Sequence, residues 1–110
     1  MENQLQQKMT KNELIIKTAE NKLAQDIRLI PIEENAGISD YFLIMTGRNK
    51  IHTQAIADAI EDALYKNEMP PRSVEGFREG TWILMDCEET IVHIFTGAER
   101  KFYDLEGLWS

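Results

Sequence analysis

The chain has 110 residues, of which 43% are hydrophobic and 28% charged, and its formal net charge is −7 at pH 7. This length and balance are typical of one globular domain. An acidic surface repels phosphate, which argues against broad electrostatic attachment to nucleic acid and favours a basic partner. No run approaches the ~18 apolar residues of a membrane span. A single cysteine, Cys87, excludes an internal disulfide and fits a reducing cytoplasm.

The first part of the chain predicts a helix followed by a strand. Asn12 is a suitable N-cap for a helix that runs to about Gln25. Residues 26–32 alternate in polarity as a strand does. Because Pro31 has no N–H to donate to a β-ladder, we expect this strand to lie at the edge of the sheet or to break there.

A second strand and the longest helix follow a predicted turn at residues 33–37. Residues 39–47 are almost continuously apolar, which favours a central position in a sheet. A helix should begin at Asn49 or Lys50 and reach about Asn67. Its apolar stripe is formed by Ile51, Ala55, Ile56, Ala59, Ile60, Ala63 and Leu64.

The most informative segment reads as two strands, residues 81–86 and 90–95, joined by the polar residues 87–89. This connection is too short for a crossover, so the strands should form an antiparallel hairpin. Side chains alternate along a strand, and both faces of both strands are largely apolar. The hairpin therefore needs a cover on each side, made of its own helices or of another protein.

The remaining elements complete an α/β fold. Residues 72–74 form a short strand, and the long connection between residues 45 and 72 implies at least one parallel strand pair. Thr96 with Glu99 matches a capping box and should start a short final helix. The apolar face of this tail comprises Phe102, Leu105 and Trp109. The sequence thus predicts a mixed sheet of about five strands packed with helices.

Two acidic residues raise an enzymatic alternative. If the strand continued past Asp86, its carboxylate and that of Glu88 would lie on one side and could hold a divalent metal, as in phosphoryl-transfer sites. Thr46 and Gly47 at the end of a strand could supply a phosphate-facing turn. The other interpretation is a hairpin tip at which both acids are simply solvated.

His93 lies within a predicted strand and has three candidate roles. It could be a hydrogen-bonded structural residue, a partner contact, or a catalytic base, and the last role requires an orienting acid and a nucleophile nearby. His52, near the start of the long helix, is expected to be a capping or surface residue. Two histidines and one cysteine without close pairing make a poor metal site.

Trp82 and Tyr103 are the strongest candidates for a protein interface. Each is a large aromatic residue with one polar atom, the type that is enriched at interface hot spots. Core packing is the alternative for both. Asp86, Asp104 and Glu106 nearby in the sequence would suit a basic partner surface.

Three blocks together resemble the ribosomal silencing factor family, RsfS, also called Iojap-related. They are DYFLIMTG at residues 40–47 with Ala57 and Asp58 after it, VEG at 74–76 with WILMD at 82–86 and VHIF at 92–95, and RKFYDLEGLW at 100–109. The resemblance covers nearly the whole chain and implies one domain over residues 1–110, with residues 1–11 as a polar, loosely ordered start. It also implies a fold akin to nucleotidyltransferases without their catalytic signature.

The resemblance implies a cytoplasmic, non-enzymatic regulator of translation. Members bind the large ribosomal subunit through ribosomal protein fourteen and block joining of the small subunit when nutrients are scarce. A homodimer is a second assembly that the resemblance implies, and no catalytic residue, metal or cofactor is expected. The partner-binding positions carried over are Trp82 and Tyr103, with Asp104, Leu105, Glu106, Asp86 and His93 as further members of the surface. A metal-dependent nucleotidyltransferase using Asp86 and Glu88 is the alternative function.

Overall fold

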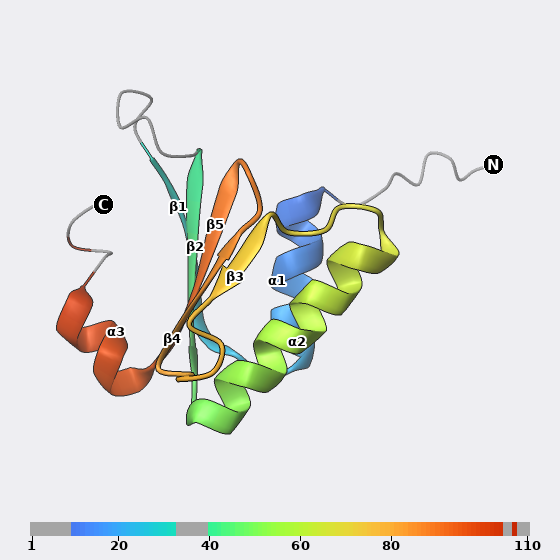
Figure 1. The fold of residues 1–110 in the computed structure, drawn as a ribbon. Helices are drawn as coiled ribbons and strands as arrows, with labels where there is room; N and C mark the ends of the chain where they lie inside the picture. Colours follow the sequence, from blue (N-terminus) through green and yellow to red (C-terminus); the bar gives the residue numbers. More distant parts are fainter. Residues whose placement is uncertain (1–9, 33–39, 105–106, 108–110) are drawn as a thin grey trace.

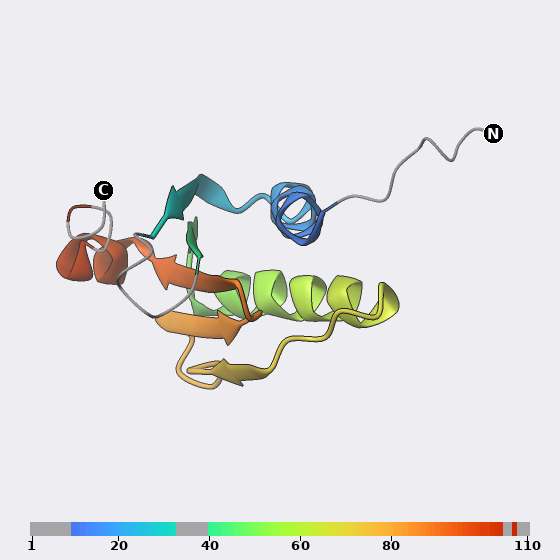
Figure 2. The ribbon, with the colours of Figure 1, turned by 90° about the horizontal axis from the view of Figure 1, so that it is seen from above.

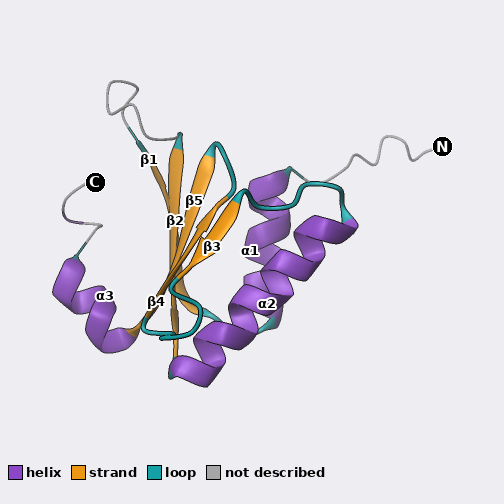
Figure 3. Ribbon diagram, in the orientation of Figure 1, coloured by secondary structure: helices purple, strands orange, loops and turns teal. Residues whose placement is uncertain are grey.

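The computed structural model describes residues 10–32, 40–104 and 107, which form one mixed sheet with helices on both of its sides (Figure 1). Figure 3 separates the helices from the strands by colour. The elements are α1 (Lys11–Asn21), β1 (Gln25–Pro31), β2 (Tyr41–Gly47), α2 (Lys50–Lys66), β3 (Ser73–Glu75), β4 (Trp82–Asp86), β5 (Thr90–Thr96) and α3 (Gly97–Tyr103). Among these described helices, none has both the length and the apolar content needed to cross a bilayer.

The strand order β1-β2-β5-β4-β3 confirms the predicted mixed sheet of five strands. β4 and β5 form the predicted antiparallel hairpin, while β2 and β5 are parallel, as the long connection through α2 required. The strand that ends in Pro31 lies at the edge, since β1 pairs only with β2 in this order. The apolar strand β2 is internal, between β1 and β5.

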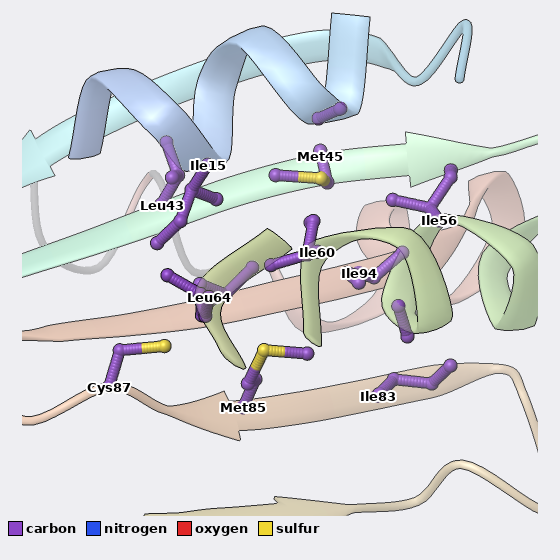
Figure 4. Close-up of a cluster of buried hydrophobic side chains, with 13 residues drawn as sticks. Ile15, Leu43, Met45, Ile56, Ile60, Leu64, Ile83, Met85, Cys87 and Ile94 are labelled. Carbon is purple, nitrogen blue, oxygen red and sulfur yellow. The ribbon is translucent and has the colours of Figure 1, made fainter. Parts of the chain in front are cut away.

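One face of the sheet is covered by α1 and α2, which lie on the same side of the strands (Figure 2). Its buried side chains come from both helices, from β2, β4 and β5, and from Cys87 just after β4, and ten of them are labelled in Figure 4. The apolar stripe of α2 confirms the predicted period at Ile56, Ile60 and Leu64, which are fully buried. Two members of the predicted stripe do not belong to this core, because Ile51, which is 77% exposed, and Ala55, also exposed, lie on the same side of α2 as the exposed Asp58 and Asp62. The buried face continues through Thr53 and Ala57 instead.

The opposite face carries a second, smaller apolar cluster. Its buried members are Ile30, Ile32, Phe42, Ile44 and Phe95, and Trp82 and Ile91 pack against them. α3 lies on this side of the sheet (Figures 1 and 2) and packs against β5 and β2. The two clusters explain why the predicted hairpin is apolar on both faces.

The helix ends differ from the prediction in ways that have local causes. Thr10, not Asn12, caps α1, because its hydroxyl accepts from the Glu13 N–H while the Glu13 carboxylate accepts from the Thr10 N–H. Asn12 instead accepts a hydrogen bond from the Thr90 hydroxyl in β5. The helix ends at Asn21 instead of Gln25, and Leu23 just beyond it has a positive φ of 64°.

The final helix begins where the sequence predicts, but its start lacks the expected interaction. Thr96 occupies the N-cap position without a side-chain hydrogen bond, so the predicted capping box with Glu99 is not formed. Phe102 is exposed instead of covering an apolar face. Leu105 and Trp109, the other members of that predicted face, lie outside the described residues, as does the predicted turn at 33–37.

A glycine allows the loop after β3 to approach the start of β4 closely, and its replacement should destabilise the fold. Gly76 has a φ of +78°, and a Cβ there would overlap the Trp82 carbonyl oxygen. Gly76→Ala should therefore lower the free energy of unfolding by roughly 2–4 kcal/mol, measured by urea denaturation. Gly97→Ala is the matched control, since a Cβ at that position meets nothing within 4 Å. Equal stability of the two variants would contradict this interpretation.

Candidate functional site

Trp82 is the first residue of β4, on the side of the sheet that carries the smaller apolar cluster. It pairs with Phe95 across the hairpin, and the two rings stack with centroids 5.0 Å apart and an interplanar angle of 29°. The indole is half-buried. Since α3 begins at Gly97, two residues after Phe95, Trp82 lies beside the strand end that leads into α3.

His93 lies beneath Trp82 and is only 3% exposed. It pairs with Leu84, so it is the diagonal cross-strand neighbour of Trp82, a position within reach of long side chains. The Trp82 indole Nε1–H donates to His93 Nδ1 over 3.0 Å, and Phe42 packs edge-on against the imidazole at 4.7 Å. The structure thus gives His93 the hydrogen-bonded structural role, and its burial leaves almost no surface for direct contact with a partner.

The surroundings of His93 also set its protonation. Burial disfavours the charged imidazolium and lowers the pKa of His93 from 6.5 to about 4. The neutral ring is therefore the form present near neutral pH. Only the neutral form has an acceptor nitrogen for the Trp82 N–H, so burial maintains this hydrogen bond.

α3 carries the second part of the predicted interface. Tyr103 is its last residue, and Asp104 follows in a left-handed conformation with φ 47°, where its carboxylate is exposed. Leu105 and Glu106 lie outside the described residues. The structure brings the start of α3 next to Trp82, and α3 lies on the same side of the sheet as this tryptophan.

A buried arginine anchors α3, and its role was not predicted from the sequence. Arg100 is 8% exposed, and its guanidinium donates to the Asp26 carbonyl at 2.7 Å and to the Thr46 hydroxyl at 2.8 Å. These bonds tie α3 to β1 and β2. Sequence periodicity could not predict this interaction, because the partners of Arg100 lie 74 and 54 residues away in the chain.

The acidic pair Asp86 and Glu88 does not form the geometry that the enzymatic alternative requires. β4 ends at Asp86, and Glu88 lies in the turn with a positive φ of 75°, so the two do not share one side of a strand. Asp86 Oδ1 accepts from the Glu88 N–H at 2.9 Å, and Glu88 lies 3.8 Å from Arg72. Within the ranges that the structure covers, no three His, Cys, Asp or Glu side chains gather where they could hold a metal ion.

The other reactive side chains have structural surroundings. Cys87 is buried, and burial raises the pKa of its thiol to about 12, so the thiolate nucleophile is suppressed. His52 is buried rather than exposed: its Nδ1 accepts from the Arg48 N–H and its Nε2 contacts the Lys22 carbonyl at 2.7 Å. This ring therefore links the start of α2 to the end of α1.

The fold and the site define a small α/β protein whose mixed sheet carries a tryptophan-centred surface opposite its main helical layer. The family model described as "Ribosomal silencing factor during starvation" matches residues 5–110. Ribosomal silencing factor RsfS of Bacillus subtilis is 39% identical over 90 residues, which cover 82% of this chain and 76% of that protein. The chain therefore belongs to the ribosomal silencing factor (RsfS) family.

Solved structures and more distant relatives agree with this assignment. A crystal structure of a Chromobacterium violaceum protein has a TM-score of 0.86 at 26% identity and covers 99% of this chain and 87% of its own. The mouse protein named "Mitochondrial assembly of ribosomal large subunit protein 1" is 24% identical over 102 residues, which cover 89% of this chain and 44% of that protein. The predicted fold class and family are thus confirmed.

The lowered pKa of His93 predicts a pH dependence of stability. The His93 ring takes up a proton near pH 6.5 in the unfolded chain but only near pH 4 in the folded chain. The contribution of the neutral ring to the free energy of unfolding is therefore complete above about pH 6.5 and is lost as the pH falls towards 4. Between about pH 7 and about pH 5 the wild type should lose about 2 kcal/mol from this group. His93→Phe has no titrating ring and should lack this loss in urea denaturation at the two pH values. An equal loss of unfolding free energy in the wild type and in His93→Phe would show that His93 does not cause this pH dependence.

Proposed function

We propose that this protein binds the large ribosomal subunit through ribosomal protein fourteen and thereby keeps the small subunit from joining. Translation then falls when nutrients are scarce. The family description names ribosome silencing during starvation, and the name of the mouse relative refers to the large ribosomal subunit. This function requires occupancy and steric bulk and no chemical turnover.

The observation that carries the proposal is the placement of Trp82. We define the Trp82–α3 surface as Trp82 and Asp104 together with Tyr103, Leu105 and Glu106, which the family resemblance assigns to the interface. Trp82 lies on the side of the sheet away from α1 and α2, next to the strand end from which α3 starts. Its indole is half-buried and held by a stack and a hydrogen bond. A large aromatic ring held in one orientation loses little conformational entropy when a partner covers its exposed part.

Electrostatics favours a basic partner for this surface. The net charge of −7 accelerates encounter with a cationic protein and disfavours direct contact with ribosomal RNA. Asp104 is exposed at the end of α3. Asp86 belongs to the same face of β4 as Trp82 but lies four residues further along, about 13 Å away at 3.3 Å per residue. Asp86 therefore contributes at the periphery of the surface rather than beside the tryptophan.

Replacing the two aromatic residues should weaken binding to the large subunit. Trp82→Ala or Tyr103→Ala should each cost roughly 2–4 kcal/mol, a loss of ~30-fold or more in affinity, because interface aromatics of this kind dominate binding energy. Cosedimentation with purified large subunits measures the change. Thermal unfolding of each variant establishes that it is folded.

Tyr65→Ala is the matched control. Tyr65 is 59% exposed on α2, on the other side of the sheet, so the same kind of truncation there should leave binding unchanged. Wild-type cosedimentation by the folded Trp82→Ala, Tyr103→Ala double variant would contradict the assigned surface.

The blocking step is tested separately from binding. Titrating the protein into a subunit-joining assay should reduce the yield of joined ribosomes in proportion to the large subunits it occupies. Normal joining at saturating occupancy would refute steric exclusion even if binding is tight. Mass measurement across a dilution series, with and without large subunits, shows whether a homodimer competes with ribosome binding.

A further inference from the structure

The hydrogen bond between Trp82 and His93 determines which nitrogen of the imidazole carries the proton. An indole N–H only donates, so His93 Nδ1 must accept, and the proton of the neutral ring resides on Nε2. Nε2 is buried and has no hydrogen-bond partner among the described residues. A buried donor without a partner costs free energy, so the choice of histidine at this position has a stability cost.

An apolar ring would avoid that cost. Phe42 contacts the imidazole edge-on, Phe95 is nearly parallel to it with centroids 6.1 Å apart, and burial is almost complete. Such surroundings suit a phenyl ring of similar shape. What histidine provides and phenylalanine lacks is the acceptor for the Trp82 N–H.

We propose that His93 is a positioning residue that holds the Trp82 indole in the orientation in which it binds the partner. This inference rests on the proposed function and specifies how its central residue is prepared. The stack on Phe95 limits tilting of the indole out of its plane, while the hydrogen bond directs its N–H edge toward the sheet. The stack and the hydrogen bond together define the direction of the indole edge that lies opposite the N–H. A ring that is already oriented pays less entropy on binding.

Two substitutions separate positioning from simple structural support. His93→Phe keeps an aromatic ring and removes both the acceptor and the unpartnered Nε2–H. His93→Asn keeps an acceptor, because its Oδ1 stands at the same number of bonds from the backbone as Nδ1, but leaves the space of the ring empty. If His93 positions Trp82, His93→Phe should be the more stable of the two variants at neutral pH, and His93→Asn should bind large subunits more tightly.

The expected result is that His93→Phe is as stable as the wild type or more stable, while its affinity for large subunits falls about 5-fold, the effect of one lost hydrogen bond. His93→Asn should be less stable than the wild type but should bind within about 2-fold of it once the folded fraction is accounted for. If affinity simply follows stability through the series, His93 is only a structural residue and the inference is overturned.

A double-mutant cycle tests the same contact directly. Trp82→Phe removes the N–H donor, so adding His93→Phe to it should cause no further loss of affinity. In a Trp109→Phe background, where Trp82 is the only tryptophan, His93→Phe should also give faster indole rotation in time-resolved fluorescence anisotropy. Additive losses of affinity in the cycle, or unchanged indole rotation, would overturn the positioning role.

The outcomes also distinguish this inference from the proposed function. If Trp82→Ala weakens binding while His93→Phe binds as the wild type does, the surface stands and the positioning role is wrong. If Trp82→Ala binds as tightly as the wild type, both the surface and the positioning role are wrong.

Discussion

β5 is the constraint on which the rest of the molecule depends. It pairs in parallel with β2 along seven residues and antiparallel with β4 along five, so every other strand is placed with reference to it. Its side chains serve both faces: Val92 and Ile94 enter the core under α1 and α2, while His93 and Phe95 enter the smaller cluster opposite. A shift of one residue in its register would exchange these two sets, because side chains alternate along a strand.

The two faces have different physical tasks. The face under α1 and α2 is a closely packed apolar core whose labelled residues carry no polar side-chain atom apart from sulfur (Figure 4). The opposite face combines aromatic rings with a buried histidine, one of whose nitrogens has no partner among the residues described. A core selected only for stability would avoid such a group. This histidine lies directly beneath Trp82, whose ring orientation the proposed binding would use.

A protein that acts by occupying a surface needs little more than a rigid scaffold and a few well-held anchors. Here the scaffold is the sheet, and each proposed anchor is held by contacts between different elements: Trp82 by His93 and Phe95, and α3 by the bonds of Arg100 to β1 and β2. In the proposed function, the acidic charge would speed the encounter with a cationic partner without defining the contact geometry. Family membership and the geometry of the site are thus consistent with a single function of binding and exclusion.

The sequence by itself determined the order and type of the elements, because periodicity and turn residues are local signals. It sufficed for the hairpin, the edge strand at Pro31, the long helix α2 and the mixed sheet, and its three blocks sufficed for the family. The predicted cap of α1 at Asn12 was wrong: Thr10 caps the helix through a capping box with Glu13, and Asn12 contacts Thr90 in β5 instead. Tertiary structure alone decided that Trp82 meets His93, that Arg100 anchors α3, and that β4 ends at Asp86 with Glu88 in the turn that follows. These facts depend on strand register and on contacts between residues far apart in the chain, which no local pattern encodes.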